Sequence, residues 1–285
     1  MLILAGFFEI KDITKLNITT NPKANYIIAA FGGLLTIFSI LIYLFDELSL
    51  GWLGRSKIKK NDLGFGTNIS KAKINILFGR LETLSSNSEE SMVVLPANEF
   101  FDDECIRDKK SALGAYVNHK FANQEKQIEN LITMHLDCYQ YIEVEKEVGV
   151  KRKSYGVGEG IFLKKPLGSR QPILFLAVTT KRAKEGLRTE MSYIFQAVRK
   201  IQHVAADNRI DSVYIPIMGS GHGGLKKEVA LFALLSAVCD FTTKPNGHHL
   251  KTINIVVFQS NEKDKPSISK IISKRLLRIA TGMFT

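Results

Sequence analysis

The stretch Val213-Tyr-Ile-Pro-Ile-Met-Gly-Ser-Gly-His-Gly-Gly224 joins an apolar run to a loop that has four glycines in six residues. The continuous apolar run at residues 213–217 is typical of a strand that is covered on both faces. Glycines let backbone N–H groups approach an anion closely, and the helix N-terminus predicted near Lys227 adds positive potential. The stretch therefore predicts a strand, a phosphate-binding loop and a helix. A tight turn without a ligand is the alternative.

The glycine loop does not fit either of two common nucleotide-binding motifs. It formally matches G-x-G-x-x-G, but a dinucleotide-binding fold carries that motif in its first strand–helix unit, and here it comes late in the chain. Leu225 follows the last glycine, which excludes the Walker pattern G-x-x-x-x-G-K-[ST]. His222 is either a ligand contact or an exposed loop side chain. The candidate ligand-binding residues of this loop are Met218, Gly219, Ser220, Gly221, His222, Gly223, Gly224 and Leu225.

A second candidate site follows the apolar run at residues 92–95, in the sequence Pro96-Ala-Asn98. An asparagine offers both donors and an acceptor, which suits a ribose hydroxyl, although a helix N-cap or a turn is the commoner use. The carboxyl end of a buried strand is where α/β folds bind ligands, and this position favours a ligand contact. The candidate residues here are Pro96, Ala97, Asn98, Glu99, Phe100, Phe101 and Asp102.

Short apolar runs alternate with helical periodicity along most of the chain. Leu187, Met191, Ile194, Val198 and Ile201, for example, recur at the spacing of an amphipathic helix. This alternation predicts an α/β fold with a parallel or mixed sheet and helices on both faces. We expect strands at residues 74–78, 92–95, 173–178, 213–217 and 253–258, and helices at 111–121, 123–137, 187–201, 227–238 and 267–279.

Residues 26–45 form a run of twenty residues without a charge. A helix needs ~20 residues to cross a hydrocarbon core of ~30 Å, so the run predicts a transmembrane helix rather than a buried core helix. The predicted organisation is an N-terminal membrane region at 1–50, a linker at 51–70 with a turn at Gly64-Phe-Gly66, and one globular domain at 71–285. The apolar residues 1–10 are too few to span, and a partial second insertion stays open.

The net charge of +11 comes with basic pairs scattered along the chain, which usually indicate a solvated surface but also suit an anionic ligand or a nearby anionic lipid surface. Lysines and arginines are slightly more numerous just after the predicted span than before it, which favours a C-terminal domain in the cytosol. The three cysteines are too few and too scattered for a metal cluster or a disulfide framework, as expected in a reducing compartment. The chain has no aromatic-basic RNA motif or zinc finger, so we expect no nucleic-acid partner.

The order of these features resembles a macro domain, the ADP-ribose-binding fold. Val93-Val-Leu-Pro-Ala-Asn98 resembles the family's strand that leads to an asparagine, and Pro216-Ile-Met-Gly-Ser-Gly221 resembles its P-x-x-G-[ST]-G loop. The resemblance implies a three-layer α/β/α sandwich with a mixed sheet, in which the loop holds the diphosphate and Asn98 the distal ribose. Asn98-Glu-Phe-Phe-Asp102, Tyr155-Gly-Val-Gly158 and Phe175-Leu-Ala-Val-Thr179 are similar to the macro domain of the Thoeris antiphage effectors, which adds Gly158 and Thr179 to the candidate residues.

The predicted anchor resembles that of the membrane-anchored, type II Thoeris effectors. The resemblance implies that a TIR-domain enzyme makes an ADP-ribose derivative, expected to be histidine-ADP-ribose, and that the macro domain binds it. The effector is then expected to form a homo-oligomer and to disrupt the lipid of the bacterial inner membrane, which causes abortive infection. The expected protein is a ligand sensor with no catalytic residues, no metal and no cofactor.

Two departures from the ordinary macro-domain pattern bear on this interpretation. Phe78-Gly-Arg80-Leu81 stands where ordinary macro domains carry G-D-[IV], and Arg80 cannot accept a hydrogen bond from an adenine amine. Residues 99–103 are acidic and aromatic where hydrolytic macro domains are glycine-rich, which counts against hydrolysis. The alternatives are a membrane-anchored ADP-ribosyl hydrolase that uses Asn98 and Asp102, and a membrane-tethered nucleotide-binding or adaptor protein.

Overall fold

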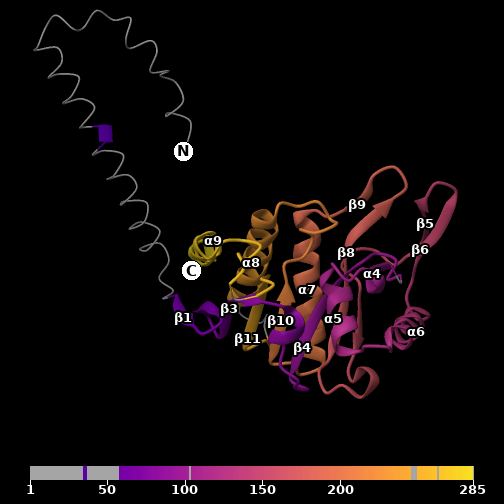
Figure 1. Ribbon diagram of the computed structural model, residues 1–285, viewed down its shortest axis with the longest axis horizontal. Coiled ribbons are helices and arrows are strands. Elements are labelled where there is room, and N and C mark those ends of the chain that lie inside the picture. Colours follow the sequence, from indigo (N-terminus) through magenta and orange to yellow (C-terminus); the bar gives the residue numbers. More distant parts are fainter. Residues whose placement is uncertain (1–34, 37–57, 103, 245–248, 262, 285) are drawn as a thin grey trace, which may run out of the picture. The chain divides into compact units, whose positions relative to one another are not determined.

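The computed structural model describes residues 35–36, 58–102, 104–244, 249–261 and 263–284 (Figure 1). The chain divides into two units, Met1–Leu53 and Gly54–Thr285, and every strand described belongs to the second. The predicted transmembrane helix at 26–45 lies outside the described residues, apart from positions 35 and 36. Within the described ranges, no helix combines the length and the apolar character that a membrane span requires.

A mixed sheet of nine strands, counted over the described residues, forms the middle layer of the second unit. Its inner strands run parallel, as their apolar sequences predict, while the edge strands pair antiparallel. β5 (Ile142–Glu147) and β6 (Val150–Ser154) form a separate antiparallel hairpin. The order in the main sheet is β1 (Lys59–Asn61), β2 (Gly64–Ile69), β3 (Ala72–Gly79), β11 (Thr252–Phe258), β10 (Ser212–Pro216), β4 (Ser91–Asn98), β8 (Ile173–Arg182) and β7 (Gly160–Leu163), with β9 (Gly186–Arg188) paired to β8.

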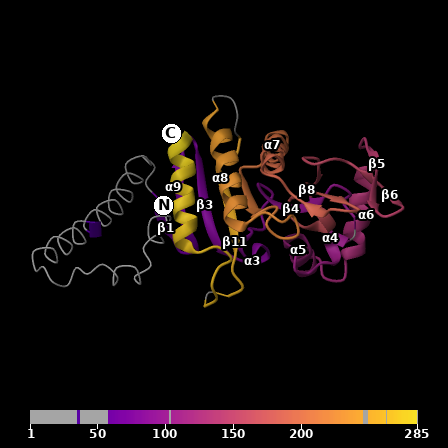
Figure 2. The same ribbon diagram turned by 90° about the horizontal axis from the view of Figure 1, so that it is seen from above.

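One face of the sheet is covered by α7 (Met191–Asp207), α8 (Lys227–Thr243) and α9 (Lys270–Phe284), which lie side by side (Figure 2). α8 contacts both of the other helices and the sheet, and its residues are apolar nearly all round, which suits this enclosed position. Strand side chains such as Met92, Val94 and Leu174 pack into this layer.

The opposite face carries α3 (Leu81–Leu84), α4 (Glu104–Arg107), α5 (Ala112–Lys120), α6 (Glu125–Leu136) and the short η2 (Pro166–Gly168). These elements pack on the alternate residues of the same strands, among them Val93, Leu95 and Phe175, because successive strand side chains point to opposite faces. The predicted α/β fold, a three-layer α/β/α sandwich with a mixed sheet, is therefore confirmed. The helices α5 to α9 each overlap a predicted helix, but Leu187, predicted at the start of the helix at 187–201, belongs to β9, and α7 begins at Met191.

The predicted linker at 51–70 differs from the structure in its second part, because β1 and β2 lie there and join the sheet. Gly64-Phe-Gly66, predicted as a turn, is the first half of β2. A Cβ on Gly64 would collide with the carbonyl oxygen of Ile76, and one on Gly66 with Oδ1 of Asn75. These glycines allow β2 to approach β3 closely, a requirement that comes from the neighbouring strand and not from a turn.

Candidate ligand-binding site

The main sheet opens at the carboxyl ends of β4 and β10. Within the described residues, the pairing between these parallel strands ends at Val93 and Tyr214, while β4 continues to Asn98. Pro96, predicted as the end of the strand, pairs with Leu176 of β8 instead, at a position where β4 has a partner on one side only. The chain leaves β4 towards β8 and leaves β10 towards β11, on opposite sides of the opening. Such a switch point is where α/β sheets bind ligands.

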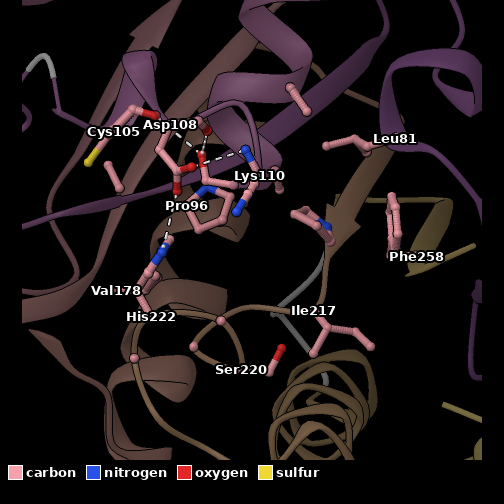
Figure 3. Close-up of a pocket in the computed structure, with 18 of the residues that line it drawn as sticks. Leu81, Pro96, Cys105, Asp108, Lys110, Val178, Ile217, Ser220, His222 and Phe258 are labelled. Atoms are coloured by element: carbon pink, nitrogen blue, oxygen red, sulfur yellow. Dashed lines mark hydrogen bonds and ion pairs between the residues drawn. The ribbon is translucent and has the colours of Figure 1, made fainter. Parts of the chain in front are cut away.

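A cavity of about 780 Å³ occupies this opening. Figure 3 shows apolar side chains, namely Leu81, Ile217 and Phe258, on one side of the cavity and Asp108 and His222 on the other. The volume is within the range of small-molecule sites, which combine apolar walls with a few polar groups. The cavity is thus suited to a ligand that has an apolar part and a polar part.

The structure brings both predicted stretches to this cavity but places only part of each in its wall. The predicted residues that line it are Pro96, Ala97, Asn98, Thr179, Gly219, Ser220, Gly221, His222 and Gly223. The predicted residues that lie outside the lining are Glu99, Phe100, Phe101, Asp102, Gly158, Met218, Gly224 and Leu225.

The glycine loop is shaped by its contact with Thr189. Gly219 has a φ of +77°, and a Cβ there would lie 2.6 Å from Thr189 Cγ2. A Cβ on Gly223 would collide with Thr189 Oγ1, and the Gly223 carbonyl accepts a hydrogen bond of 2.9 Å from the Thr189 N–H. A Cβ on Gly221, in contrast, meets no atom within 4 Å. Packing therefore explains Gly219 and Gly223 but not Gly221, which borders the cavity.

Positive potential reaches the cavity from α8 and from a pair of lysines. α8 begins at Lys227, a cavity residue, and its N-cap Lys226 supplies no side-chain hydrogen bond. The first N–H groups of α8 are therefore available to an anion. Lys109 and Lys110 line the cavity ahead of α5, and across the described ranges neither forms an ion pair with a carboxylate. This side of the cavity is suited to phosphate oxygens.

Asn98 reaches the cavity and uses part of its carboxamide within the protein. Its Nδ2 donates to Asp102 Oδ1 at 3.1 Å, and its Oδ1 accepts from the Phe100 N–H at 2.9 Å. These bonds form a turn after β4, in which Phe101 has a φ of +50°. One N–H and one lone pair of the carboxamide remain for a ligand. The turn and the ligand contact, predicted as alternatives, are therefore compatible.

Glu99 lies behind the cavity wall and fixes the end of β4. Only 2% of its surface is exposed, and its carboxylate accepts hydrogen bonds from Ser154 Oγ at 2.5 Å and from the Lys181 N–H at 3.0 Å. The Arg182 guanidinium donates to the same carboxylate and neutralises its charge. A buried carboxylate paired in this way joins β4, β6 and β8, so Glu99 has a structural role rather than a place in the wall.

Asp102 is also bound within the protein. Lys146 of β5 lies with its Nζ 2.7 Å from Asp102 Oδ2 and 2.8 Å from Glu104 Oε1. Burial alone would lower the pKa of Lys146, but the hydrogen bonds to both carboxylates raise it above its ordinary value. The hydrogen bond from Lys146 likewise lowers the pKa of Glu104. Asp102 therefore holds β5 in place and does not face the cavity, where a general acid or base would have to lie.

The remaining predicted residues support the cavity from behind. Met218 is fully buried in the core beneath the loop, and the Leu225 N–H closes the loop by donating to the Gly219 carbonyl at 3.1 Å. Gly158 has a φ of +86° and donates its N–H to Ala177 at 2.9 Å. The predicted residues with structural positions of this kind are Phe100, Phe101, Gly158, Met218, Gly224 and Leu225.

The wall also includes residues that the sequence did not single out for binding. Glu82, which follows Leu81 in α3, lines the cavity, and Oε1 of its largely buried carboxylate lies 3.1 Å from Arg80 Nε. Cys105 lines the polar side, where burial raises the pKa of its thiol to about 12 and keeps it protonated and unreactive. Lys109 and Lys110 could have been predicted from the sequence, because two lysines directly precede a helix that is capped by Ser111.

The chain matches one protein-family model and several solved structures. A family model described as "Thoeris protein ThsA, Macro domain" matches residues 74–257, more than half of the chain, whereas no curated protein matches it. The Oceanobacillus iheyensis macrodomain with MES bound is 14% identical, with a TM-score of 0.53 over 75% of this chain and 95% of that chain. The same macrodomain with ADP is 14% identical, with a TM-score of 0.51 over 75% and 94% of the two chains. A mutant of it with ADPR is 13% identical, with a TM-score of 0.51 over 75% and 96%.

The structural similarities agree with the three-layer sandwich described above, and they show the macro-domain fold. The family match extends from β3 to β11 and includes both the turn at Asn98 and the glycine loop. The chain therefore belongs to the family of the macro domain of the Thoeris protein ThsA.

Proposed function

We propose that the cavity binds an ADP-ribose derivative as a signal and releases it unchanged. The observation that carries this proposal is the glycine loop, in which Gly221 has no packing reason to be glycine and borders the cavity close to the start of α8 at Lys227. Backbone N–H groups in such an arrangement bind diphosphate oxygens. The similar folds of the Oceanobacillus iheyensis macrodomain structures with ADP and with ADPR support this choice of ligand.

The polarity of the cavity suggests how the ligand is oriented. The diphosphate lies along the glycine loop, the distal ribose lies at Asn98, and the adenosine extends towards Leu81 and Phe258. Arg80 cannot accept a hydrogen bond from the adenine amine, but the Glu82 carboxylate can. The ion pair with Arg80 holds that carboxylate in the wall, so we assign the recognition of adenine to Glu82.

Binding without turnover is favoured over the hydrolase alternative by the position of Asp102. Its carboxylate is bound to Lys146 and to Asn98 and lies outside the cavity lining, so it cannot reach a ligand without breaking both contacts. Cys105 carries a thiol with a raised pKa and is not an activated nucleophile. These two observations support a sensor.

Within the family, the chain is proposed to act as a membrane-anchored effector of a Thoeris-type antiphage defence. The proposed signal is histidine-ADP-ribose made by a TIR-domain enzyme, and the proposed anchor is the apolar run at residues 26–45 in the bacterial inner membrane. The folded unit is then cytosolic, where it meets the signal. Binding leads to a homo-oligomer that disrupts the membrane and ends the infection.

Calorimetry of the full-length chain in detergent tests the ligand. Titrations with ADP-ribose and with histidine-ADP-ribose should show binding, tighter for the conjugate, and chromatography of the mixture should recover each ligand intact. Steady release of free ADP-ribose from the conjugate would contradict the sensor, and no heat from either compound would contradict the site. Dye leakage from liposomes that contain the chain, measured with and without the conjugate, tests the action on the membrane separately.

A further inference from the structure

The hairpin of β5 and β6 is tied to the rest of the domain through Lys146, Glu147 and Ser154, but its two strands do not join the main sheet. Figures 1 and 2 both place it at the end of the sheet opposite to α9. Apolar side chains of the hairpin and its flanks are exposed, with exposed fractions of 66% at Ile142, 81% at Val148 and 40% at Val150. A two-stranded hairpin is marginally stable in water, and free strand edges readily pair with another chain. In the described part of the protein, β5 and β6 pair only with each other.

The two strands carry opposite charges in matching positions. The carboxylates of Glu143 and Glu145 follow each other on one face of β5, and the register places them opposite Lys153 and Lys151 of β6. All four residues are exposed. They do not include Lys146, the β5 residue whose side chain binds Asp102. The hairpin therefore presents an acidic free edge on β5 and a basic free edge on β6.

We infer that this hairpin is the surface through which copies of the chain meet, with the β5 edge of one copy against the β6 edge of the next. This pairing places each row of glutamates between two rows of lysines. A contact between two β5 edges would place glutamates beside glutamates, and one between two β6 edges lysines beside lysines, both of which are unfavourable. The contact joins different surfaces on the two copies, so it adds copies in an open series or a ring rather than as a two-fold dimer.

Lys146 connects this surface to the cavity. It is part of β5, and its Nζ binds both Asp102 and Glu104, of which Glu104 lines the cavity while Asp102 binds the cavity residue Asn98. A ligand that orders this wall also orders β5, and it therefore favours the hairpin conformation that copies recognise. This dependence on a ligand rests on the proposed function, whereas the contact between the hairpins does not.

Charge exchange tests the contact. Full-length E143K/E145K has a basic hairpin, and K151E/K153E has an acidic one, so neither should bind its own copies. An equimolar mixture restores Glu–Lys neighbours between copies but leaves like charges opposite each other inside each hairpin, whereas the variant with all four substitutions restores both sets of neighbours. Mass photometry and sedimentation in detergent, over a concentration series with and without histidine-ADP-ribose, should show assemblies for the wild type, the mixture and the fourfold variant. Each double variant alone should associate at least on the order of tenfold more weakly.

Several outcomes would overturn the inference. A wild type that stays monomeric at every concentration, double variants that assemble as the wild type does, or a fourfold variant that does not regain mass each contradict it. Thermal unfolding confirms that the variants are folded, and calorimetry of each variant measures ligand binding independently. A chain that binds no ligand but assembles through the hairpin contradicts only the proposed function, and a chain that assembles on ligand binding but is unaffected by the charge exchange contradicts only the inference.

Discussion

His222 Nε2 lies 3.5 Å from Asp108 Oδ2, and this contact connects the glycine loop to the segment that precedes α5. The other oxygen of the carboxylate accepts a hydrogen bond of 3.0 Å from the Lys110 N–H. The polar side of the cavity thus combines cations with carboxylates, of which that of Asp108 competes with a phosphate for His222.

Asp108→Asn is expected to strengthen the binding of ADP-ribose by about fivefold, because it removes one charge that repels the diphosphate across partly solvated space. Calorimetry measures the change. Asp240→Asn is the matched control, since Asp240 pairs with Lys244 at the far end of α8 and should leave affinity unchanged. Weaker binding by the Asp108 variant would mean that its carboxylate contacts the ligand directly.

Gly221→Glu should abolish binding and leave the fold intact. The new Cβ meets no atom within 4 Å, so the side chain can be built, but its carboxylate then occupies the place of a phosphate. Gly221→Ala is the control and should bind nearly as well as the wild type. Gly219→Ala, with its positive φ and its contact with Thr189, should instead lower the melting temperature. Full binding by the glutamate variant would reduce the loop to a turn.

Asn98→Ala should weaken both the protein and its ligand binding. It leaves the Phe100 N–H without its partner, which costs about 1–2 kcal/mol of unfolding free energy, and it removes one or two ligand hydrogen bonds of about 1 kcal/mol each. Denaturant titration measures the first effect and calorimetry the second. Asn98→Ser keeps a side-chain oxygen that can accept from the Phe100 N–H and adds no charge beside Asp102, so it should lose affinity with a smaller loss of stability. An affinity unchanged in both variants would remove Asn98 from the ligand contacts.

The assignment of adenine to Glu82 predicts base selectivity. The wild type should bind ADP-ribose about tenfold more tightly than the analogue with hypoxanthine, which presents a carbonyl where adenine presents its amine. Glu82→Ala should lose this preference, while Arg80→Ala, which loses the ion pair but keeps the acceptor, should reduce it only in part. Competition titrations with the two nucleotides measure the ratio. Equal ratios in the wild type and the Glu82 variant would place adenine elsewhere.

The ion pairs of Lys146 predict that the stability of the protein falls at acidic pH. The pKa of Glu104 is lowered by the hydrogen bond from Lys146, so this contribution to stability is present above the ordinary value of 4.5 and is lost as the pH falls through the lowered pKa. Glu104 is half exposed, and solvent screening keeps its share small. Lys146→Met should be about 2 kcal/mol less stable near pH 7 and should lose less on further acidification. Urea titrations at several pH values provide the comparison.

Periodicity predicted the layers of the fold well because burial leaves a direct mark on composition. Burial makes the strands β8 and β10 apolar throughout and sets the spacing of Ile194, Val198 and Ile201 in α7. These patterns do not depend on which sheet or helix covers the residues, so they can be recognised without knowing the neighbouring element. Gly64 and Gly66 were misjudged for the opposite reason. Both positions must lack a side chain because Ile76 and Asn75 of β3 lie too close, and the local sequence does not reveal this contact.

The candidate site was predicted at its two sequence motifs and missed where the wall is assembled by tertiary contacts. Gly221 and Asn98 lie in stretches with recognisable local chemistry, and both border the cavity. Glu99 and Asp102 share the second stretch, but Arg182 and Lys146, distant in sequence, bind their carboxylates elsewhere. Glu82 belongs to the wall only because β3 places the start of α3 beside the opening, which no local motif encodes.

The early end of pairing between β4 and β10 gives this sheet a seam. Over the described residues, β4 pairs with β10 at Ser91, Met92 and Val93 only, and the two strands do not pair beyond Val93. A molecule bound in this opening contacts both strands, and any compound that binds the folded protein but not the unfolded chain raises the melting temperature by mass action. Thermal shift can therefore sort cell extracts for the natural signal before its chemical structure is known.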